Sequence, residues 1–230
     1  MGDWGDRAPV AQRPPWVFGW HGRPNLLGRA ADCDSWMILL LAIALAMLAA
    51  LLQGGKLVRL AHVSFRYGWL AILAFAMQIS VIYFPDPPLD GLISWKSFII
   101  PVSYGIILFV AILNIKMPGL IFIIFGLLLN ILVISANGGF MPVTLEALSR
   151  AGLGHMALGT GNGARVMASK DVILSREATR LWFLSDILVL SKPFPLGSVF
   201  SVGDILLALG VFVLLQRTMC SKGPLEKANL

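Results

Sequence analysis

The 230-residue sequence is short of charged residues and of cysteine. Only 13% of its residues are charged, where a soluble domain usually has about a quarter, and 57% are hydrophobic. A protein core of ordinary size cannot enclose that much apolar surface. The composition therefore excludes a single soluble domain and indicates a protein that lies in lipid.

Motifs for metals, disulfides and nucleotides are also missing. The two cysteines, Cys33 and Cys220, form no CxxC or Cys/His pattern of a zinc or redox site. They flank all the apolar runs and are expected on opposite sides of a membrane, so we predict no disulfide. The glycine-rich GTGNGA (159–164) lacks the spacing of either phosphate-binding loop. No cofactor or metal is expected.

What the sequence does contain is five long apolar runs. Each has 16 or 17 residues and at most one charge, close to the roughly 17 to 25 residues that cross a bilayer as a helix. None shows the polar stripe of a surface helix. We predict an all-α membrane protein with five transmembrane helices. The runs are Met37–Leu52, Trp69–Phe84, Phe98–Asn114, Gly119–Ser135 and Val199–Leu215.

The orientation follows from the basic residues in the connections. Seven Lys and Arg residues lie in the first and third connections and the C-terminal tail, whereas the second has Asp86 and Asp90 against Lys96. Basic short loops are cytoplasmic, which predicts an inner-membrane protein with its N-terminus outside. The net charge of +6 thus reflects topology rather than nucleic-acid binding. The seven are Lys56, Arg59, Arg66, Lys116, Arg217, Lys222 and Lys227.

The two ends of the chain differ from the membrane domain, 37–217. Segment 1–36 is rich in Pro, Gly, Trp and Arg and has no periodicity. Two interpretations remain open: translation starts at Met37, which removes four arginines from the outer side, or the segment is a disordered arm. Segment 218–230 is predicted to be a cytoplasmic tail.

The outer loop, 136–198, is the longest connection. Gly138 and Gly139 are expected to end the fourth helix, and Pro142 to precede a short helix over Thr144–Ala151. Segment 176–190, REATRLWFLSDILVL, has apolar residues at helical spacing. It predicts an amphipathic interfacial helix, after which Pro193–Pro195 turns the chain back to the membrane.

Asp204 is the one charged residue within any run. It has two compatible interpretations. As a functional group, it faces the bundle near its outer end and pairs with Arg180 or Lys170 as a substrate or proton site. As a structural group, it completes a capping box with Ser201 at the start of the last helix.

Other polar residues in the runs point to contacts between helices. Asn130 and Asn137 lie on one face of the fourth helix. Asn130 is expected to bond to a neighbouring helix, and Asn137 either does the same or lines an outer pocket. Pro101 should kink the third helix, and Gln78, Ser80, Ser103 and Tyr104 complete this polar set.

Several segments are similar to a bacterial integral-membrane family known as domain of unknown function 5317. They are the start from Met37, NGGFMPV from Asn137, SKDVIL from Ser169, TRLWFLSDIL from Thr179 and PFPLGSVFSVGDILLALGVF from Pro193. The resemblance covers about Met37 to Leu215. It implies a multi-pass bacterial membrane protein and implies no activity, ligand or catalytic residue.

These observations leave three hypotheses for function. The first is a non-enzymatic binding or accessory subunit whose outer polar cap engages a partner protein or an anionic lipid headgroup. The second is a small transporter or lipid-handling protein that uses Asp204 with Arg180. The third, a membrane enzyme, lacks paired catalytic groups. The candidate binding residues are Asn137, Lys170, Arg180, Asp186 and Asp204.

Overall fold

The computed structural model describes residues 35–83, 95–167, 169–191 and 197–221, with side chains from residue 39 onward. The chain divides into two units, Met1–Asp32 and Cys33–Leu230, and every described residue lies in the second. The predicted N-terminal arm and the turn over Pro193–Pro195 lie outside the described residues, as does the tail beyond residue 221.

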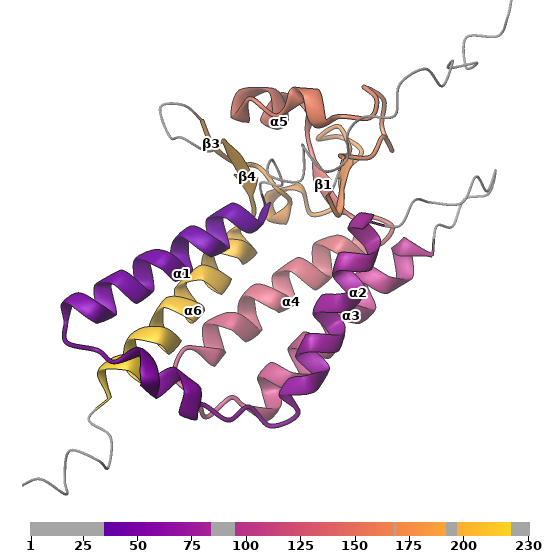
Figure 1. Cartoon of the computed structure of the whole chain (residues 1–230). Helices are drawn as coiled ribbons and strands as arrows, with labels where there is room; N and C mark the ends of the chain where they lie inside the picture. Colours follow the sequence, from indigo (N-terminus) through magenta and orange to yellow (C-terminus); the bar gives the residue numbers. More distant parts are fainter. Residues whose placement is uncertain (1–34, 84–94, 168, 192–196, 222–230) are drawn as a thin grey trace, which may run out of the picture. The chain divides into compact units, whose positions relative to one another are not determined.

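Helices occur at all five predicted runs (Figure 1). The first four begin and end within two residues of the predicted bounds. Strongly apolar sequence is enough to locate such helices, even where Pro101 lies inside the third of them. They are α1 (Ser35–Leu52), α2 (Gly68–Tyr83), α3 (Lys96–Leu113), α4 (Leu120–Ala136) and α6 (Val202–Cys220).

Two of these helices, α3 and α6, are long and apolar enough to cross a membrane. In the other three apolar helices, the stretch whose side chains are described is shorter. These stretches are Leu39–Leu52, Gly68–Tyr83 and Leu120–Ala136. Length and composition therefore mark two helices in the described part of the chain as candidate spans.

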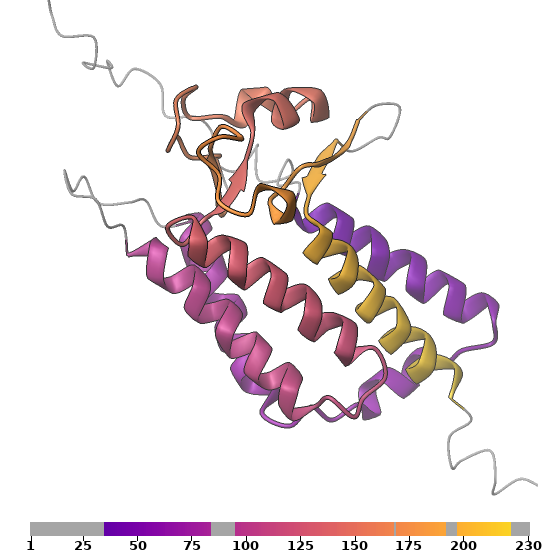
Figure 2. The ribbon, with the colours of Figure 1, turned by 180° about the vertical axis from the view of Figure 1, so that it is seen from behind.

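The five helices pack in two layers. In one layer α4 lies between α6 and α3; in the other, α1 packs on α6 and α2 packs on α3 (Figures 1 and 2). No helix of the second layer covers α4, because α1 and α2 lie on either side of it (Figure 1). A 3₁₀ helix, η2 (Leu57–His62), lies in the connection from α1 to α2.

Glycines bring α4 and α6 into close contact. A Cβ at Gly126 would lie 2.6 Å from the carbonyl oxygen of Gly203, and one at Gly210 would lie 2.8 Å from that of Gly119. Small residues at such contacts let two backbones approach directly, as in many membrane helix pairs. Any side chain at these positions would force the two helices apart.

The loop between α4 and α6 forms a cap over one end of the bundle. We use the term cap for the described residues of 137–201. Its helix α5 (Leu145–Ala151) confirms the predicted short helix: Thr144 accepts a hydrogen bond from the Ala147 N–H, and Gly152 ends it at φ 83°. Two further 3₁₀ helices are η3 (Gly154–Met156) and η4 (Trp182–Leu184).

The cap also contains β-structure, so the all-α prediction is wrong for this part. Strand β1 (Met141–Val143) pairs in parallel with β2 (Asp171–Ile173), in the register Met141 to Asp171. Strand β3 (Leu188–Leu190) pairs antiparallel with β4 (Ser198–Phe200). The β1–β2 pair joins segments far apart in the sequence, and local periodicity reveals neither pairing.

The predicted amphipathic helix over 176–190 is also wrong. Leu181 has φ 54°, which breaks any right-handed helix there. The Asp186 N–H then donates to the Pro142 carbonyl at 3.1 Å, and β3 follows. Pairing with β1 and β4 satisfies the backbone in an extended form, and β-branched Ile187 and Val189 suit that form.

The last helix starts three residues later than predicted, at Val202 instead of Val199. Val199 and Phe200 belong to β4, although they continue the apolar run. The capping box is confirmed: Ser201 accepts from the Asp204 N–H, and the Asp204 side chain accepts from the Ser201 N–H. This polar signal, rather than hydrophobicity, marks the start of the helix.

Candidate functional site

A cavity of about 180 Å³ lies over α4, between α1 and α2, and we call it the hollow. All five long helices and one cap residue line it, and most of the lining is apolar. The uncovered stretch of α4 thus becomes the floor of a pocket. The lining residues are Leu39, Phe75, Gln78, Val81, Ile82, Ile100, Tyr104, Ile107, Ile123, Leu127, Lys170, Asp204, Leu207 and Val211.

The polar residues of the hollow gather at its cap end. Asp204 lies in the first turn of α6, and Lys170 comes from the cap itself. Tyr104 and Gln78 lie in the halves of α3 and α2 nearer the cap. Apolar residues such as Ile123 and Val211 line the part farther from the cap. The hollow therefore has its polar groups at the cap end, among apolar residues such as Val81 and Ile100, and is apolar at the other end, so we call the cap end its polar end.

Lys170 is held by the end of α4 and the β1–β2 pair. Gly138 and Gly139, at φ 74° and 86°, end α4 as predicted and turn the chain into β1. The Met141 N–H donates to the Lys170 carbonyl at 3.3 Å. From there the Lys170 ammonium reaches the bundle and donates to the Tyr104 hydroxyl oxygen at 2.6 Å.

The charge of Lys170 is stabilised by its surroundings. Burial lowers the pKa of Lys170, but nearby acidic groups, chiefly Tyr104 and Asp204, outweigh that effect. The net result is a pKa well above the usual value. Within the described part of the chain, the Lys170 ammonium donates a single hydrogen bond, to Tyr104, and forms no ion pair. A charged group with unused N–H donors therefore faces the hollow.

Asp204 is fixed by neighbours on two helices. Asn130 of α4 donates to its Oδ1 at 2.9 Å, and the Ser201 N–H and hydroxyl lie 3.0 and 2.9 Å from its Oδ2. Asn130, fully buried, also lies 3.0 Å from the Ser201 hydroxyl through its carbonyl oxygen. The prediction that Asn130 bonds to a neighbouring helix is confirmed. Its partner is the capping box of α6.

Two buried carboxyls of the cap flank β1. Asp171 lies opposite Met141 in the parallel pair, and Asp186 pairs with Val143 on the other side of β1. Asp186 is 1% exposed and Asp171 is 7% exposed, and Oδ1 of each has no hydrogen-bond partner. Unpaired buried carboxyl oxygens favour the protonated form of one of the two groups.

The pKa shifts of the two carboxyls agree with this arrangement. Burial and then the charge of Asp171 raise the pKa of Asp186 well above the ordinary carboxyl value. Burial also raises the pKa of Asp171, although Lys170 lowers it. Asp186 therefore keeps its proton to a higher pH than an exposed carboxyl does.

Asn137 and Arg180 lie together outside the hollow. The Asn137 amide donates to the Arg180 carbonyl at 2.8 Å and accepts from the Arg180 N–H at 2.9 Å. The bonds use only the Arg180 backbone, and its side chain is exposed. No ion pair between Asp204 and Arg180 is found among the described residues, where Asp204 instead bonds to Asn130 and Ser201.

A sequence model of a family of unknown function, DUF5317, matches residues 62–216, more than half of the chain. The chain belongs to DUF5317. The matched range contains α2, α3, α4, the cap and most of α6, and with them every candidate binding residue. The predicted resemblance to this family is confirmed over that range.

This DUF5317 chain is similar to an uncharacterised protein of Thermotoga maritima. The two are 28% identical over 130 residues, which cover 56% of this chain and 70% of the relative. No solved structure matches the chain. The comparisons thus supply a family, and the chemistry has to come from the site.

The structure brings together three of the five residues singled out from the DUF5317 sequence. Lys170, Asp186 and Asp204 interact electrostatically around the cap end of the hollow. Sequence reasoning gave Tyr104 no specific role and missed Asp171. Tyr104 shares a helix face with Ile100 and Ile107, a signal for a residue facing the interior. Among the described residues no cluster of three or more His, Cys, Asp or Glu could hold a metal.

Proposed function

We propose that this protein is a multi-pass membrane protein that binds the apolar chain of an amphiphile in the hollow. The observation that carries the proposal is the hollow itself: an apolar pocket between α1 and α2 whose polar groups gather at one end. An amphiphile has the same division, with a polar head and an apolar chain. This is the lipid-handling hypothesis of the sequence analysis, except that Lys170 supplies the positive charge instead of Arg180.

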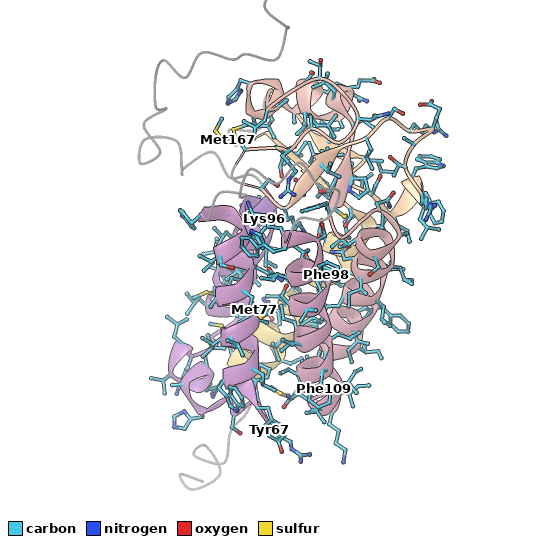
Figure 3. The ribbon with its side chains drawn as sticks, turned by 90° about the vertical axis from the view of Figure 1, so that its right-hand side faces the viewer. Tyr67, Met77, Lys96, Phe98, Phe109 and Met167 are labelled. Atoms are coloured by element: carbon cyan, nitrogen blue, oxygen red, sulfur yellow. The ribbon has the colours of Figure 1, made fainter. Side chains whose placement is uncertain are left out.

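Exposed apolar side chains support membrane insertion with five spans. Ile72 of α2 is 73% exposed, Phe98 of α3 is 61% exposed and Phe125 of α4 is 54% exposed. Figure 3 shows Phe98 near the cap end of α3 and Phe109 near the opposite end. Apolar surface along several helices is costly in water and favourable in lipid. Each of the five helices is proposed to span the bilayer.

The basic residues support an orientation with the cap outside a bacterial inner membrane. Lys56, Arg59, Arg66 and Lys116 lie in the two short connections opposite the cap, and such loops are usually cytoplasmic. In a variant without Cys33 and Cys220, Ser149→Cys in α5 should react with a membrane-impermeant thiol reagent on intact cells, whereas Ser64→Cys should not. Labelling of Ser64→Cys alone would reverse the orientation.

The size of the hollow favours one chain rather than a whole lipid. Its volume of about 180 Å³ is below the roughly 300–1,000 Å³ of pockets that enclose a drug-sized ligand. A chain end or a single acyl chain can enter between α1 and α2 while the rest of the molecule stays in the bilayer. The protein would then bind lipid from the side.

The experiment compares two neighbouring residues of α1. Leu39 lines the hollow, and Leu40 is 57% exposed. Leu39→Trp should fill the pocket and reduce the lipid that co-purifies in mild detergent, measured by native mass spectrometry. Leu40→Trp should leave it unchanged. If the two variants retain the same lipid while both remain folded, the hollow is not a binding site.

A second candidate is the accessory subunit, which one feature of the cap favours. Leu181, Trp182 and Phe183 form an exposed apolar turn, and Arg176 stacks 3.8 Å from the Trp182 ring. Exposed aromatic residues next to an Arg are common in protein interfaces. Phe183→Ser should then release a co-purifying partner without changing the bound lipid, whereas an unchanged set of partners would oppose this role.

A further inference from the structure

The ammonium of Lys170 is the only positively charged group that lines the hollow within the described part of the chain. It has three N–H donors, and among the described residues it donates one hydrogen bond, to Tyr104. Asp204 lines the same end, but Asn130 and Ser201 already bond to its carboxylate. The hydrogen-bonding groups that remain unused at the polar end are therefore mainly donors.

Charge limits what these donors can bind. The carboxyls of Asp204, Asp186 and Asp171 act electrostatically on Lys170, and Arg165 acts on Asp171. Asp186 sits where its charged form is disfavoured. With Asp186 neutral, the two remaining carboxylates and the two cations about balance. A head with two negative charges would meet the field of Asp204 with Lys170 as the one cation in the described lining, and a cationic head would be repelled by Lys170.

We infer that the hollow is selective for amphiphiles whose head has a net charge of −1 carried on oxygen, a carboxylate or a phosphodiester without a neighbouring cation. The head accepts hydrogen bonds from Lys170 at the polar end, and the chain runs along the floor toward Ile123. This inference rests on the proposed function, because it specifies the head of the molecule whose chain the hollow holds. Charge-assisted hydrogen bonds are the strong kind that such a head forms.

The test uses the full chain in mild detergent and three probes with the same acyl chain: oleate, dioleoyl phosphatidylglycerol and dioleoyl phosphatidylcholine. Native mass spectrometry titrations should give at least about tenfold tighter binding of one or both anionic probes than of phosphatidylcholine. Preference for oleate alone assigns a carboxylate head, and preference for phosphatidylglycerol alone assigns a phosphodiester.

Variants distinguish the effect of Lys170 on binding from the effect of the protein's overall positive charge. Lys170→Met should abolish the preference, Lys170→Arg should retain it, and Lys116→Met, an exposed residue at the other end of the bundle, should not change it. Lys170→Arg and a thermal unfolding measurement control for loss of fold. Preference that survives in folded Lys170→Met overturns the inference.

The outcomes also separate this inference from the proposed function. Equal binding of all three probes, with Leu39→Trp still reducing binding, overturns selectivity and leaves the hollow as a lipid site. Binding that is insensitive to both Leu39→Trp and Lys170→Met overturns both proposals. Anionic preference lost in Lys170→Met and binding lost in Leu39→Trp together support both.

Discussion

The Lys170 ammonium donates a 2.6 Å hydrogen bond to the Tyr104 hydroxyl, and this bond joins the cap to the inward face of α3. The two residues are 66 positions apart. The cation lies 5.3 Å from the centre of the same ring, which places it beyond the hydroxyl at the edge of the ring. This pair fixes the cap over the hollow and positions the cation at its polar end.

Replacement of Tyr104 by Phe should weaken that connection. The ammonium would lose its hydrogen bond while remaining partly buried, at an expected cost of about 2 kcal/mol. Thermal unfolding in detergent measures the change. Tyr83→Phe is the matched control, because Tyr83 is 70% exposed on α2. Equal stabilities of the two variants would show that the hydrogen bond contributes little.

A methyl group at Gly210 should separate α4 from α6. Its Cβ would lie 2.5 Å from the Ile123 side chain and 2.8 Å from the Gly119 carbonyl. Gly210→Ala should therefore destabilise the protein by about 1–3 kcal/mol.

Gly105→Ala in α3 is the control, because nothing lies within 4 Å of its added Cβ. It should be neutral or stabilising by up to about 1 kcal/mol, since alanine is the better helix former. The same loss in both variants would mean that the close packing of the glycines is not what holds α4 and α6 together.

Stability should fall as pH rises because of Asp186. Burial and Asp171 raise the pKa of this carboxyl in the folded protein, so the folded state binds more protons than the unfolded state. Its contribution is fully present below about pH 4, the unfolded value, and decreases as pH rises through the folded pKa.

The variant Asp186→Asn is neutral at every pH and should remove this part of the pH dependence. Unfolding measured from pH 4 to pH 8 tests it, with Glu146→Gln, an exposed carboxyl of α5, as control. If Asp186→Asn retains the full wild-type slope while Glu146→Gln changes it, the titrating group is not Asp186.

Asp204 and Arg180 should respond differently to neutralisation. Asp204→Asn places an NH₂ group against the donors of Asn130 or Ser201, at a cost of about 1–2 kcal/mol. Arg180→Gln keeps both backbone bonds to Asn137 and should change stability by less than about 0.5 kcal/mol. Equal losses, and no further loss in the double variant, would instead indicate a coupled pair.

The sequence predicted the helices better than the cap. Four apolar runs end at polar residues or, after Phe84, at a proline, so hydrophobicity locates α1 to α4. The run that starts at Val199 passes from β4 into α6 without a change in hydrophobicity. There the correct boundary was given by the Ser201 and Asp204 capping pattern, because the first turn of a helix needs polar partners for its N–H groups.

The candidate site was predictable in part for a similar reason. Asp204 stood out because a charge within an apolar run needs partners, and Lys170 was named as one of two possible cations. The choice between Lys170 and Arg180 depends on the strand pairing of β1 with β2, which directs Lys170 toward Tyr104. Such contacts join distant segments, and spacing along the chain does not encode them.

The most direct test of lipid binding in the hollow is a crosslinking map. A bifunctional oleate with a diazirine in its chain is incorporated in cells, activated by light, and its adducts on the purified protein are located by mass spectrometry. The account predicts adducts on Ile123 and Leu127, the floor of the hollow, which Leu39→Trp removes. Adducts confined to outward residues such as Phe125 and Leu128, unchanged by Leu39→Trp, would contradict it.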